Sequence, residues 1–408
     1  MKILLGLDSW YPNVDGVVRT VENYAKYLSQ DGECQVAVPS YDGVKTGEPD
    51  FPFEIHRTSS AGVPFLHTHK GALPAFDWNL SQSIRQGDFE LLHAHSPFTM
   101  GDFFAKHGAK ANVPTVFTFH TKFRDEFLSI TGSEMLTKLL LAKIMKTINL
   151  FDYVVAVSDN AAATLREYGY RKPIKVIRNG TDMAVPTAEQ TRSMIHKVNE
   201  EYGLAEVANV FLYVGRVVPV KNLPFSFEVL KKLKERGVDF RFLVVGGGNY
   251  VSRDGDYVEE YKKQVAEMGL SDEVIFTGAV TDRAQLQAFY SRADLLLFPS
   301  VFDNASITMI EAASCALPSM VPSSSSSAET LTDMQNGFVA DLDAEVWADK
   351  LQKILADKEK LAEVAVNAQK TVYRSWRDVV TEVESFYADC IARKSAENFG
   401  KRKKTVND

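Results

Sequence analysis

Short, uninterrupted apolar runs recur along the first 160 residues and alternate with stretches of helical periodicity. The first run is Ile3-Leu4-Leu5-Gly6-Leu7, and similar runs occupy 35–39, 91–94, 115–119 and 153–157. Such runs are typical of parallel strands that are covered on both faces. Between them, apolar residues return every three or four positions at 17–28, 97–111, 133–149 and 159–168, as in helices. This alternation requires crossover connections and predicts an α/β fold with a parallel sheet.

The same alternation begins again near residue 209. Strands are predicted at 210–214, 240–245, 274–276 and 295–298, with a helix over 222–236. A chain of 408 residues is too long for one ordinary core, and the polar stretch 183–203 is the natural junction. We therefore expect two Rossmann-like domains, over 1–184 and 185–372. A final helix is expected over 373–393, followed by a disordered basic tail over 394–408.

Composition excludes several classes of protein. The net charge of −7 argues against a general nucleic-acid binder, which needs a broad basic surface. Three cysteines, Cys34, Cys315 and Cys390, lie far apart and indicate reduced thiols rather than disulfides. The first apolar run is too short for a signal peptide, and we find no run of about 20 apolar residues. We expect a cytoplasmic protein with no nucleic-acid partner and no obligate protein partner.

A loop with two cations follows the first strand of the second half. It runs from Gly215 to Asn222 and carries Arg216 and Lys221. In open parallel sheets ligands bind beyond the carboxyl ends of the strands, and a helix N-terminus attracts anions. Two cations there suit a diphosphate, whose charge must be held and then stabilised as it leaves. Alternatively, both side chains are solvated loop residues.

A second polar turn separates the strand at 295–298 from a helix that is expected to begin near Ser306. Asp303 lies in this turn and Glu311 about two turns into the helix. Acids beside a mostly apolar helix should not be buried without partners. Sugar hydroxyls are suitable partners because each can donate a hydrogen bond. Alternatively, Asp303 caps the helix and Glu311 pairs with a lysine.

Histidines end two of the predicted strands in the first half. His120 follows the run 115–119, where a ligand would bind, although a core histidine with internal hydrogen bonds is the alternative. His93 and His95 could contact an acceptor or support the fold. A metal site is disfavoured because no third ligand is near them in sequence. We interpret the acidic segments 254–256 and 341–343 as surface turns and predict no metal.

Together these features resemble the retaining glycosyltransferases of the GT-B fold, often called family four. The matching pieces are the Gly16 loop, Phe119-His120-Thr121, Asn179-Gly180-Thr181-Asp182, Gly215-Arg216 with Lys221-Asn222, and Asp303 with Glu311. The resemblance covers residues 1 to about 390. It implies two Rossmann-like domains with a cleft between them, and a C-terminal helix that crosses back to the N-terminal domain.

The resemblance also implies roles for individual residues. Arg216 and Lys221 would bind the donor diphosphate, and Glu311 the ribose hydroxyls. Asp303 would contact the transferred sugar, helped by the amides of Asn304, Ala305 and Ser306. The base would lie against the backbone of 275–278, which includes Phe276 and Gly278. Gly16 would let the N-terminal loop approach the phosphates, and His120 would line the cleft by the sugar.

Two departures from the family matter. The family usually has glutamate where this chain has Asp303, which leaves the identity of the donor sugar open. It often has two glycines where this chain has Asp15-Gly16, which leaves the path of that loop open.

The acceptor side is suggested by a basic, amphipathic helix over 133–149. Lys138, Lys143 and Lys146 lie among apolar residues there, and such helices can lie on anionic lipid surfaces. Lipid-modifying members of the family are thought to use this part of the N-terminal domain in that way. The favoured alternative is that the apolar stripe packs on its own sheet. His95, Lys138 and Lys143 are the acceptor-side candidates.

The expected activity is transfer of a hexose, with retention, from a nucleotide-diphosphate sugar such as UDP-glucose to an acceptor hydroxyl. A membrane glycolipid such as diacylglycerol is one candidate acceptor, with peripheral association at the inner face of the membrane. No cofactor or metal is expected. The alternatives are a sugar-nucleotide epimerase of the same fold and a non-catalytic nucleotide-sugar-binding protein.

Overall fold

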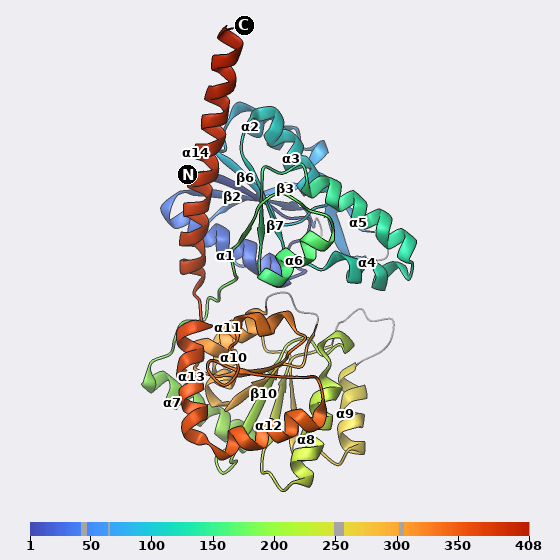
Figure 1. Ribbon diagram of the computed structural model, residues 1–408, viewed down its shortest axis with the longest axis vertical. Helices are drawn as coiled ribbons and strands as arrows, with labels where there is room; N and C mark the ends of the chain where they lie inside the picture. Colours follow the sequence, from blue (N-terminus) through green and yellow to red (C-terminus); the bar gives the residue numbers. More distant parts are fainter. Residues whose placement is uncertain (42–46, 64–65, 249–256, 302–305, 408) are drawn as a thin grey trace. The chain divides into compact units, whose positions relative to one another are not determined.

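Two compact units make up the chain in a computed structural model that describes residues 1–41, 47–63, 66–248, 257–301 and 306–407. Unit 1 comprises Met1–Asn179 with Trp376–Asp408, and unit 2 comprises Gly180–Ser375 (Figure 1). Each unit holds its own parallel sheet with helices around it. The predicted fold of two Rossmann-like α/β domains is therefore confirmed.

Unit 1 is built on a seven-stranded parallel sheet of order β3-β2-β1-β6-β7-β8-β9. All five predicted strands are present, because their apolar runs are buried on both faces. The edge strands β3 and β9 and a separate antiparallel hairpin, β4–β5, were not predicted. The bounds are β1 (Lys2–Gly6), β2 (Glu33–Pro39), β3 (Glu54–Thr58), β4 (Ser60–Val63), β5 (Leu66–Ala72), β6 (Leu91–Ala94), β7 (Thr115–Phe119), β8 (Tyr153–Ala156) and β9 (Ile174–Val176).

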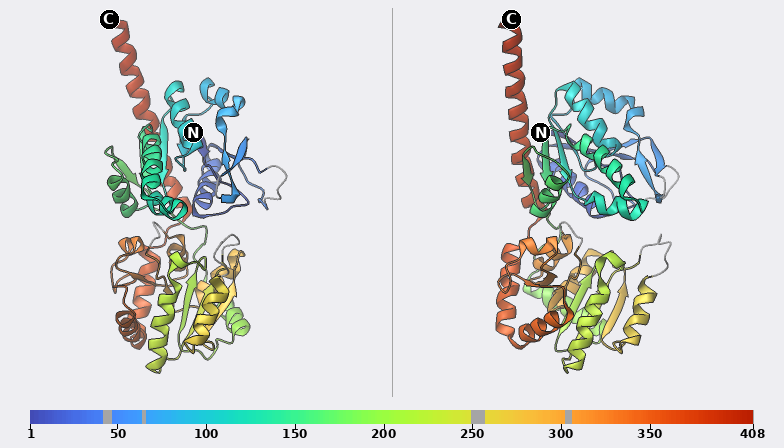
Figure 2. Two further views of the ribbon diagram at one scale, coloured as in Figure 1. Left: turned by 90° about the vertical axis from the view of Figure 1, so that its right-hand side faces the viewer. Right: turned by 45° about the vertical axis from the view of Figure 1, so that its right-hand side comes forward.

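Helices cover both faces of this sheet. On one side α1 packs against α14, and on the other α3 contacts both α2 and α5; α14 and α5 stand on opposite sides of the unit (Figures 1 and 2). The bounds are α1 (Gly16–Asp31), α2 (Trp78–Gln86), α3 (Thr99–Ala111), α4 (Phe123–Thr131), α5 (Glu134–Ile148), α6 (Asp159–Glu167) and α14 (Trp376–Asn407), with a short 3-10 turn, η1 (Pro74–Phe76), before α2.

The last helix joins the first domain, as expected. Tyr387 and Cys390 of α14 are buried, and Arg377 pairs with Asp31 of α1 at 2.7 Å. The tail differs from the prediction, because α14 continues through the basic stretch to Asn407 instead of becoming disordered after residue 393. Lys394 pairs with Asp152 at 2.6 Å, and alanine, glutamate and lysine in this stretch favour a helix.

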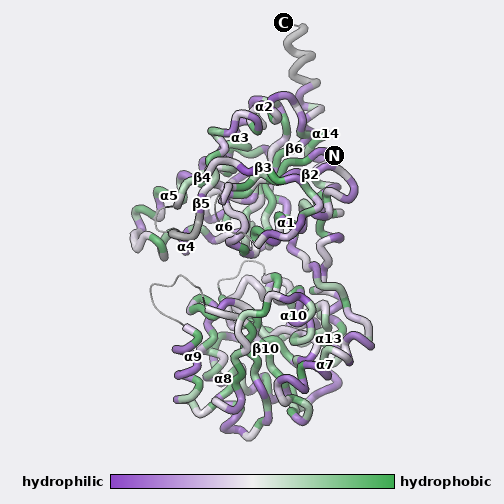
Figure 3. The backbone as a smooth tube through the Cα atoms, turned by 180° about the vertical axis from the view of Figure 1, so that it is seen from behind, coloured by the Kyte–Doolittle hydropathy of each residue, from purple (hydrophilic) through white to green (hydrophobic). Residues whose placement is uncertain are grey.

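Unit 2 has a six-stranded parallel sheet of order β12-β11-β10-β13-β14-β15. Its central strands, like those of unit 1, are largely hydrophobic and buried (Figure 3). The strands are β10 (Val210–Val214), β11 (Arg241–Val245), β12 (Val274–Gly278), β13 (Leu295–Leu297), β14 (Ser319–Pro322) and β15 (Phe338–Ala340). The helices are α7 (Ala188–Tyr202), α8 (Leu223–Glu235), α9 (Tyr257–Glu267), α10 (Arg283–Arg292), α11 (Ile307–Ser314), α12 (Ala344–Ala356) and α13 (Lys358–Thr371), with 3-10 turns η2 (Pro219–Lys221) and η3 (Ser326–Thr330).

The polar stretch 183–203, predicted as the domain junction, is mostly the helix α7. Thr187 and Gln190 form a capping box at its start, and Val198 is buried in the core of unit 2. The boundary between the units lies earlier, between Asn179 and Gly180. Helix α7 packs on α10 along one narrow stripe, so most of its surface is polar and resembles a linker in sequence.

Candidate functional site

Three neighbouring strands of unit 2 end in glycine at the carboxyl edge of the sheet. Gly215 follows β10, Gly246 follows β11, and Gly278 ends β12. A Cβ on Gly246 would lie 1.8 Å from the carbonyl oxygen of Gly215, so only glycine fits there. Gly246 donates its N–H to Gly278 O at 2.9 Å. The absence of side chains at these positions lets a ligand approach the backbone closely.

The predicted base-binding stretch is the strand β12. The Phe276 ring is partly buried and packs edge-on against Phe227, with ring centroids 6.3 Å apart. The ring therefore belongs to the core of unit 2. A base could meet this stretch through its backbone and through Gly278, whose positive φ of 81° favours glycine. The contact itself stays a prediction.

The two predicted phosphate ligands lie in the loop between β10 and α8. Arg216 is exposed, and its guanidinium makes no ion pair or hydrogen bond with the residues that the structure describes. Its backbone carbonyl accepts a hydrogen bond from Tyr213 Oη at 2.8 Å, which fixes the start of the loop. Lys221 ends the 3-10 turn η2, with its Nζ 5.7 Å from the ring centroid of Phe298.

This loop is joined to the end of β13. The Asn222 side chain donates to Pro299 O, and Ser300 Oγ donates to Val220 O, both at 3.5 Å. The structure therefore brings Lys221 next to the start of the turn that carries the first predicted acid. Asp303, Asn304 and Ala305 lie outside the described residues. Ser306 is the N-cap residue of α11, as the sequence predicted for the start of that helix.

Glu311 is buried in α11 and takes part in a network of polar side chains. Its Oε2 accepts a hydrogen bond from Tyr290 Oη at 2.8 Å, and its Oε1 lies 2.8 Å from Arg283 Nη2. Arg283 also pairs with Asp182. Asp182 lies in the Asn-Gly-Thr-Asp segment, whose first residue, Asn179, ends the first part of unit 1 and whose other three residues begin unit 2. Burial raises the pKa of Glu311, while the ion pair with Arg283 and the hydrogen bond from Tyr290 act in the opposite direction. The partner of Glu311 is thus an arginine rather than a lysine.

These contacts leave capacity for a ligand on Glu311. A carboxylate has about four acceptor sites, two on each oxygen. Arg283 and Tyr290 use one site on each oxygen, so a second site on each oxygen has no partner among the residues that the structure describes. This is the chemistry expected of a residue that holds a ribose diol. Sequence reasoning missed Arg283 and Tyr290, which carry no motif.

In unit 1, Gly16 is the first residue of α1, and a Cβ placed on it would meet no described atom within 4 Å. Packing therefore does not require glycine here. Asp15 is the N-cap of this helix, and its carboxylate accepts from Val17 N at 2.8 Å and Val18 N at 2.9 Å. Because Asp15 occupies these two amides, they are not available to a phosphate.

Three histidines lie together at the carboxyl ends of β6 and β7. His95 Nδ1 is 3.0 Å from His120 Nε2, with the two rings stacked at 5.2 Å. His93 lies behind His95, with ring centroids 4.1 Å apart. Burial lowers the pKa of His120 to about 3 and lowers the pKa values of the other two well below the ordinary range. All three rings are therefore neutral near pH 7.

Helix α5 divides into two parts. In its second half Ile144, Met145 and Ile148 are buried, as expected of a helix that packs on its own sheet. In its first half Met135 is 73% and Leu139 60% exposed. The surrounding exposed side chains are Leu136 and Leu140 of α5, Ile130 of α4, and the lysines Lys138, Lys143 and Lys146. The predicted amphipathic helix thus presents apolar and basic groups to the surface.

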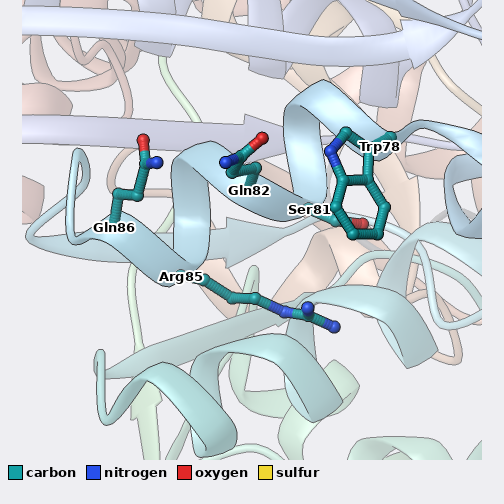
Figure 4. Close-up of a pocket in the computed structure, with 5 residues that line it drawn as sticks. All are labelled: Trp78, Ser81, Gln82, Arg85 and Gln86. Carbon is teal, nitrogen blue, oxygen red and sulfur yellow. The ribbon is translucent and has the colours of Figure 1, made fainter.

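A hollow on α2 lies apart from the predicted site residues. It is lined by Trp78, Ser81, Gln82, Arg85 and Gln86, all from this one helix (Figure 4). No acid, histidine or cysteine lines it, so it offers neither an acid–base pair nor a metal ligand set. Throughout the described ranges no group of three or more His, Cys, Asp or Glu residues is placed to hold a metal ion. No helix in the part of the chain that was searched is long and apolar enough to span a bilayer.

Solved structures with this fold include a UDP complex of Anabaena HepE. It has a TM-score of 0.77 and 20% identity, and the match covers 95% of this chain and 100% of HepE. Sucrose-phosphate synthase from Thermosynechococcus elongatus matches with a TM-score of 0.75 and 19% identity, over 96% of this chain and 100% of the synthase. At this level of identity both comparisons show the fold.

Among curated proteins, alpha-monoglucosyldiacylglycerol synthase of Streptococcus pneumoniae is 21% identical over 78% of this chain and 70% of its own length. A GDP-mannose-dependent alpha-mannosyltransferase of Corynebacterium glutamicum is 22% identical over 96% and 90%. The model of the family "Glycosyltransferase Family 4" matches residues 14–185, and that of "Glycosyl transferases group 1" matches 195–371. Since these two models together cover most of the chain, the protein belongs to the family-four glycosyltransferases of the GT-B fold.

Proposed function

We propose that this glycosyltransferase moves a hexose, with retention of configuration, from a UDP-sugar to a hydroxyl of a membrane lipid. The observation that carries the donor half is the carboxyl edge of unit 2. There three neighbouring strands end in glycine, and Arg216 and Lys221 lie in the loop after the first of them. The carboxylate of Glu311 lies in α11, which follows the neighbouring strand β13. These groups match the base, diphosphate and ribose of a nucleotide sugar in chemistry.

The choice of UDP and glucose is supported by relatives. HepE structures contain UDP and UDP-glucose, and the pneumococcal relative is named as a glucosyldiacylglycerol synthase. The corynebacterial relative is named for GDP-mannose, so the donor must be tested directly.

In the proposed reaction the bond between the anomeric carbon and the diphosphate oxygen breaks, and a bond to the acceptor oxygen forms on the same face of the sugar. The proton of the acceptor hydroxyl passes to an oxygen of the leaving diphosphate. Arg216 and Lys221 stabilise the charge that develops on this diphosphate, so no metal is required. The neutral histidines of unit 1 carry no charge into this step.

The lipid acceptor is supported by the exposed face of α5. Leu136, Leu139 and Leu140 expose apolar surface beside Lys138 and Lys143. Apolar side chains can enter the headgroup region while lysines bind anionic lipids. A helix of this kind lies on a membrane without crossing it, as peripheral association requires.

The donor is tested by incubating the full chain with UDP-, GDP- and ADP-linked glucose, galactose and mannose and measuring slow hydrolysis. Release of sugar and UDP from one UDP-sugar supports the proposal. If only GDP-mannose is turned over, the donor is GDP-mannose and not a UDP-sugar. Tight UDP binding without turnover in any acceptor mixture would favour a non-catalytic binding protein. Proton exchange at C2 of the sugar would favour an epimerase.

The membrane half is tested by sedimentation with vesicles of phosphatidylglycerol and phosphatidylcholine. The variant Leu139→Glu should reduce binding to anionic vesicles by about tenfold, because the apolar leucine surface is replaced by a charge. Val366→Glu is the matched control, since Val366 is 47% exposed on α13 in unit 2. Equal binding by both variants and the wild type would contradict a role for α5.

A further inference from the structure

The contacts among His93, His95 and His120 in unit 1 determine which ring nitrogens carry protons. One hydrogen atom must lie between His95 Nδ1 and His120 Nε2, which are 3.0 Å apart, because two bare lone pairs would repel each other at this distance and two N–H groups would collide. Either His95 or His120 donates it. The choice fixes the tautomers of both rings, since each neutral imidazole holds one N–H.

The other nitrogen of His95 decides between the two possibilities. His95 Nε2 is buried and has no hydrogen-bond partner among the described residues. If His120 donated, His95 would carry its proton at Nε2, and a buried N–H would be left without an acceptor. If His95 donates, only an imine lone pair is left without a partner. Orphaned buried donors are rarer than under-satisfied acceptors.

The surroundings hold the His95 ring in this orientation. His93 packs against it at 4.1 Å, and Tyr24 packs edge-on at 5.5 Å. His93 is itself fixed at both nitrogens, by Tyr387 Oη at 2.5 Å and by Thr118 Oγ1 at 2.7 Å. Tyr387 belongs to the C-terminal helix α14, so this helix holds His93, the residue that packs against His95.

We propose that His95 is a positioning residue that donates its Nδ1–H to Nε2 of His120 and thereby keeps the proton of His120 on Nδ1. Whatever ligand group His120 contacts at Nδ1 must then accept a hydrogen bond, as a sugar hydroxyl or phosphate oxygen can. His120 cannot take the acceptor's proton at that atom, because the position is already protonated. This consequence for the reaction rests on the proposed function, whereas the tautomer does not.

The tautomers are measured by NMR on the full chain with ¹⁵N-labelled histidine at pH 7. Long-range ¹H–¹⁵N correlations show directly which nitrogen of each ring is protonated. The His95 and His120 signals are assigned from the variants His95→Asn and His120→Asn. We expect a protonated Nδ1 and a bare Nε2 on both rings. A proton on Nε2 of either ring would overturn the proposal.

Two variants of His95 distinguish a role in positioning the His120 proton from a role in filling space. Asparagine at 95 places an amide N–H where Nδ1–H stood, while leucine fills the space without a donor. His95→Leu should shift His120 toward the Nε2–H form and lower donor turnover by about tenfold, the worth of one hydrogen bond. His95→Asn should keep the His120 tautomer and restore most of the turnover. An unchanged His120 tautomer in His95→Leu contradicts the proposal.

The control is His107→Gln on α3, which should leave the signals of His95 and His120 and the turnover unchanged. If His95→Leu does not fold, the wild-type spectrum alone decides the tautomers. If the wild type turns over no donor, the proposed function fails while the spectrum still tests the histidine pair. The two failures are therefore distinguishable.

Discussion

Replacing Arg283 by leucine should destabilise unit 2 by about 2 kcal/mol at pH 8. Arg283 Nη2 lies 2.8 Å from Glu311 Oε1, and the Glu311 side chain is only 9% exposed. Removing the partner of a buried charge costs about 3–5 kcal/mol. The Arg283 side chain is itself 41% exposed, and Tyr290 still donates to the other oxygen, so we take a value below this range.

Thermal unfolding measures this loss. For a unit of about 200 residues, 1 kcal/mol corresponds to about 2–4 °C in Tm, so the expected shift is about 4–8 °C. Burial already holds the pKa of Glu311 above its unfolded value, and loss of Arg283 raises it further. A protonated Glu311 needs no cation. The stability of the variant therefore falls as pH rises through the folded pKa, and its deficit should be larger at pH 8 than at pH 5.

A double-mutant cycle identifies the cause. Glu311→Gln removes the charge, so the variant with both substitutions should lose clearly less than the sum of the two single losses. Lys262→Leu breaks an exposed pair with Glu259 on α9 and should change stability by less than about 0.5 kcal/mol. Strict additivity, or equal deficits at pH 5 and pH 8, would refute the argument.

Three further predictions follow from the same structure. Lys221→Ala should lower turnover at least about a hundredfold through loss of a charge-stabilising group, and near-normal turnover would remove the proposed mechanism. Asp15→Ser keeps a helix cap but removes a negative charge, so the donor KM should fall about fivefold; an unchanged KM would show that the phosphates lie elsewhere. Unit 1 should lose stability as pH falls below about 6.5, because His93, His95 and His120 are neutral when folded and take up protons when unfolded, by about 1.4 kcal/mol per pH unit for each ring at most. Chemical denaturation from pH 7.5 to 5 measures that slope, and the variant His120→Asn should reduce it.

The central strands could be predicted because burial on both faces leaves an uninterrupted apolar run. β1 and β7 are such cases. The edge strand β3 has exposed and partly exposed residues at most positions, so its sequence, Glu-Ile-His-Arg-Thr, shows no run. Helix α7 was predicted to be a junction because only a narrow stripe of its residues is covered, and the rest of its sequence is polar. Burial alone did not decide the outcome. Helix α8 was predicted from its helical spacing although one face is in water, while the buried strand β14 was missed because its sequence, Ser-Met-Val-Pro, shows no apolar run.

Some contacts between the candidate site residues could be predicted from strand order, and others could not. His95 and His120 each come directly after a strand, and β6 and β7 are parallel neighbours, so their proximity could have been inferred from strand order. Arg283 and Tyr290 could not, because their contact with Glu311 depends on how α10 and α11 pack, which no spacing in sequence encodes. The predicted acid pair is described at Glu311, while Asp303 lies outside the described residues.

The candidate residues of the two units differ in charge. Unit 2 contributes the cations Arg216 and Lys221, while the histidines of unit 1 are neutral because their burial lowers the pKa values. If the leaving diphosphate is stabilised as proposed, its charge must be met by unit 2. A neutral His120 ring can contribute only hydrogen bonds without charge, which are worth about half as much as those to charged groups. Loss of the His120 hydrogen bond should therefore cost less turnover than loss of the Lys221 charge, and the opposite ranking would mean that the proton, rather than the phosphate, limits the reaction.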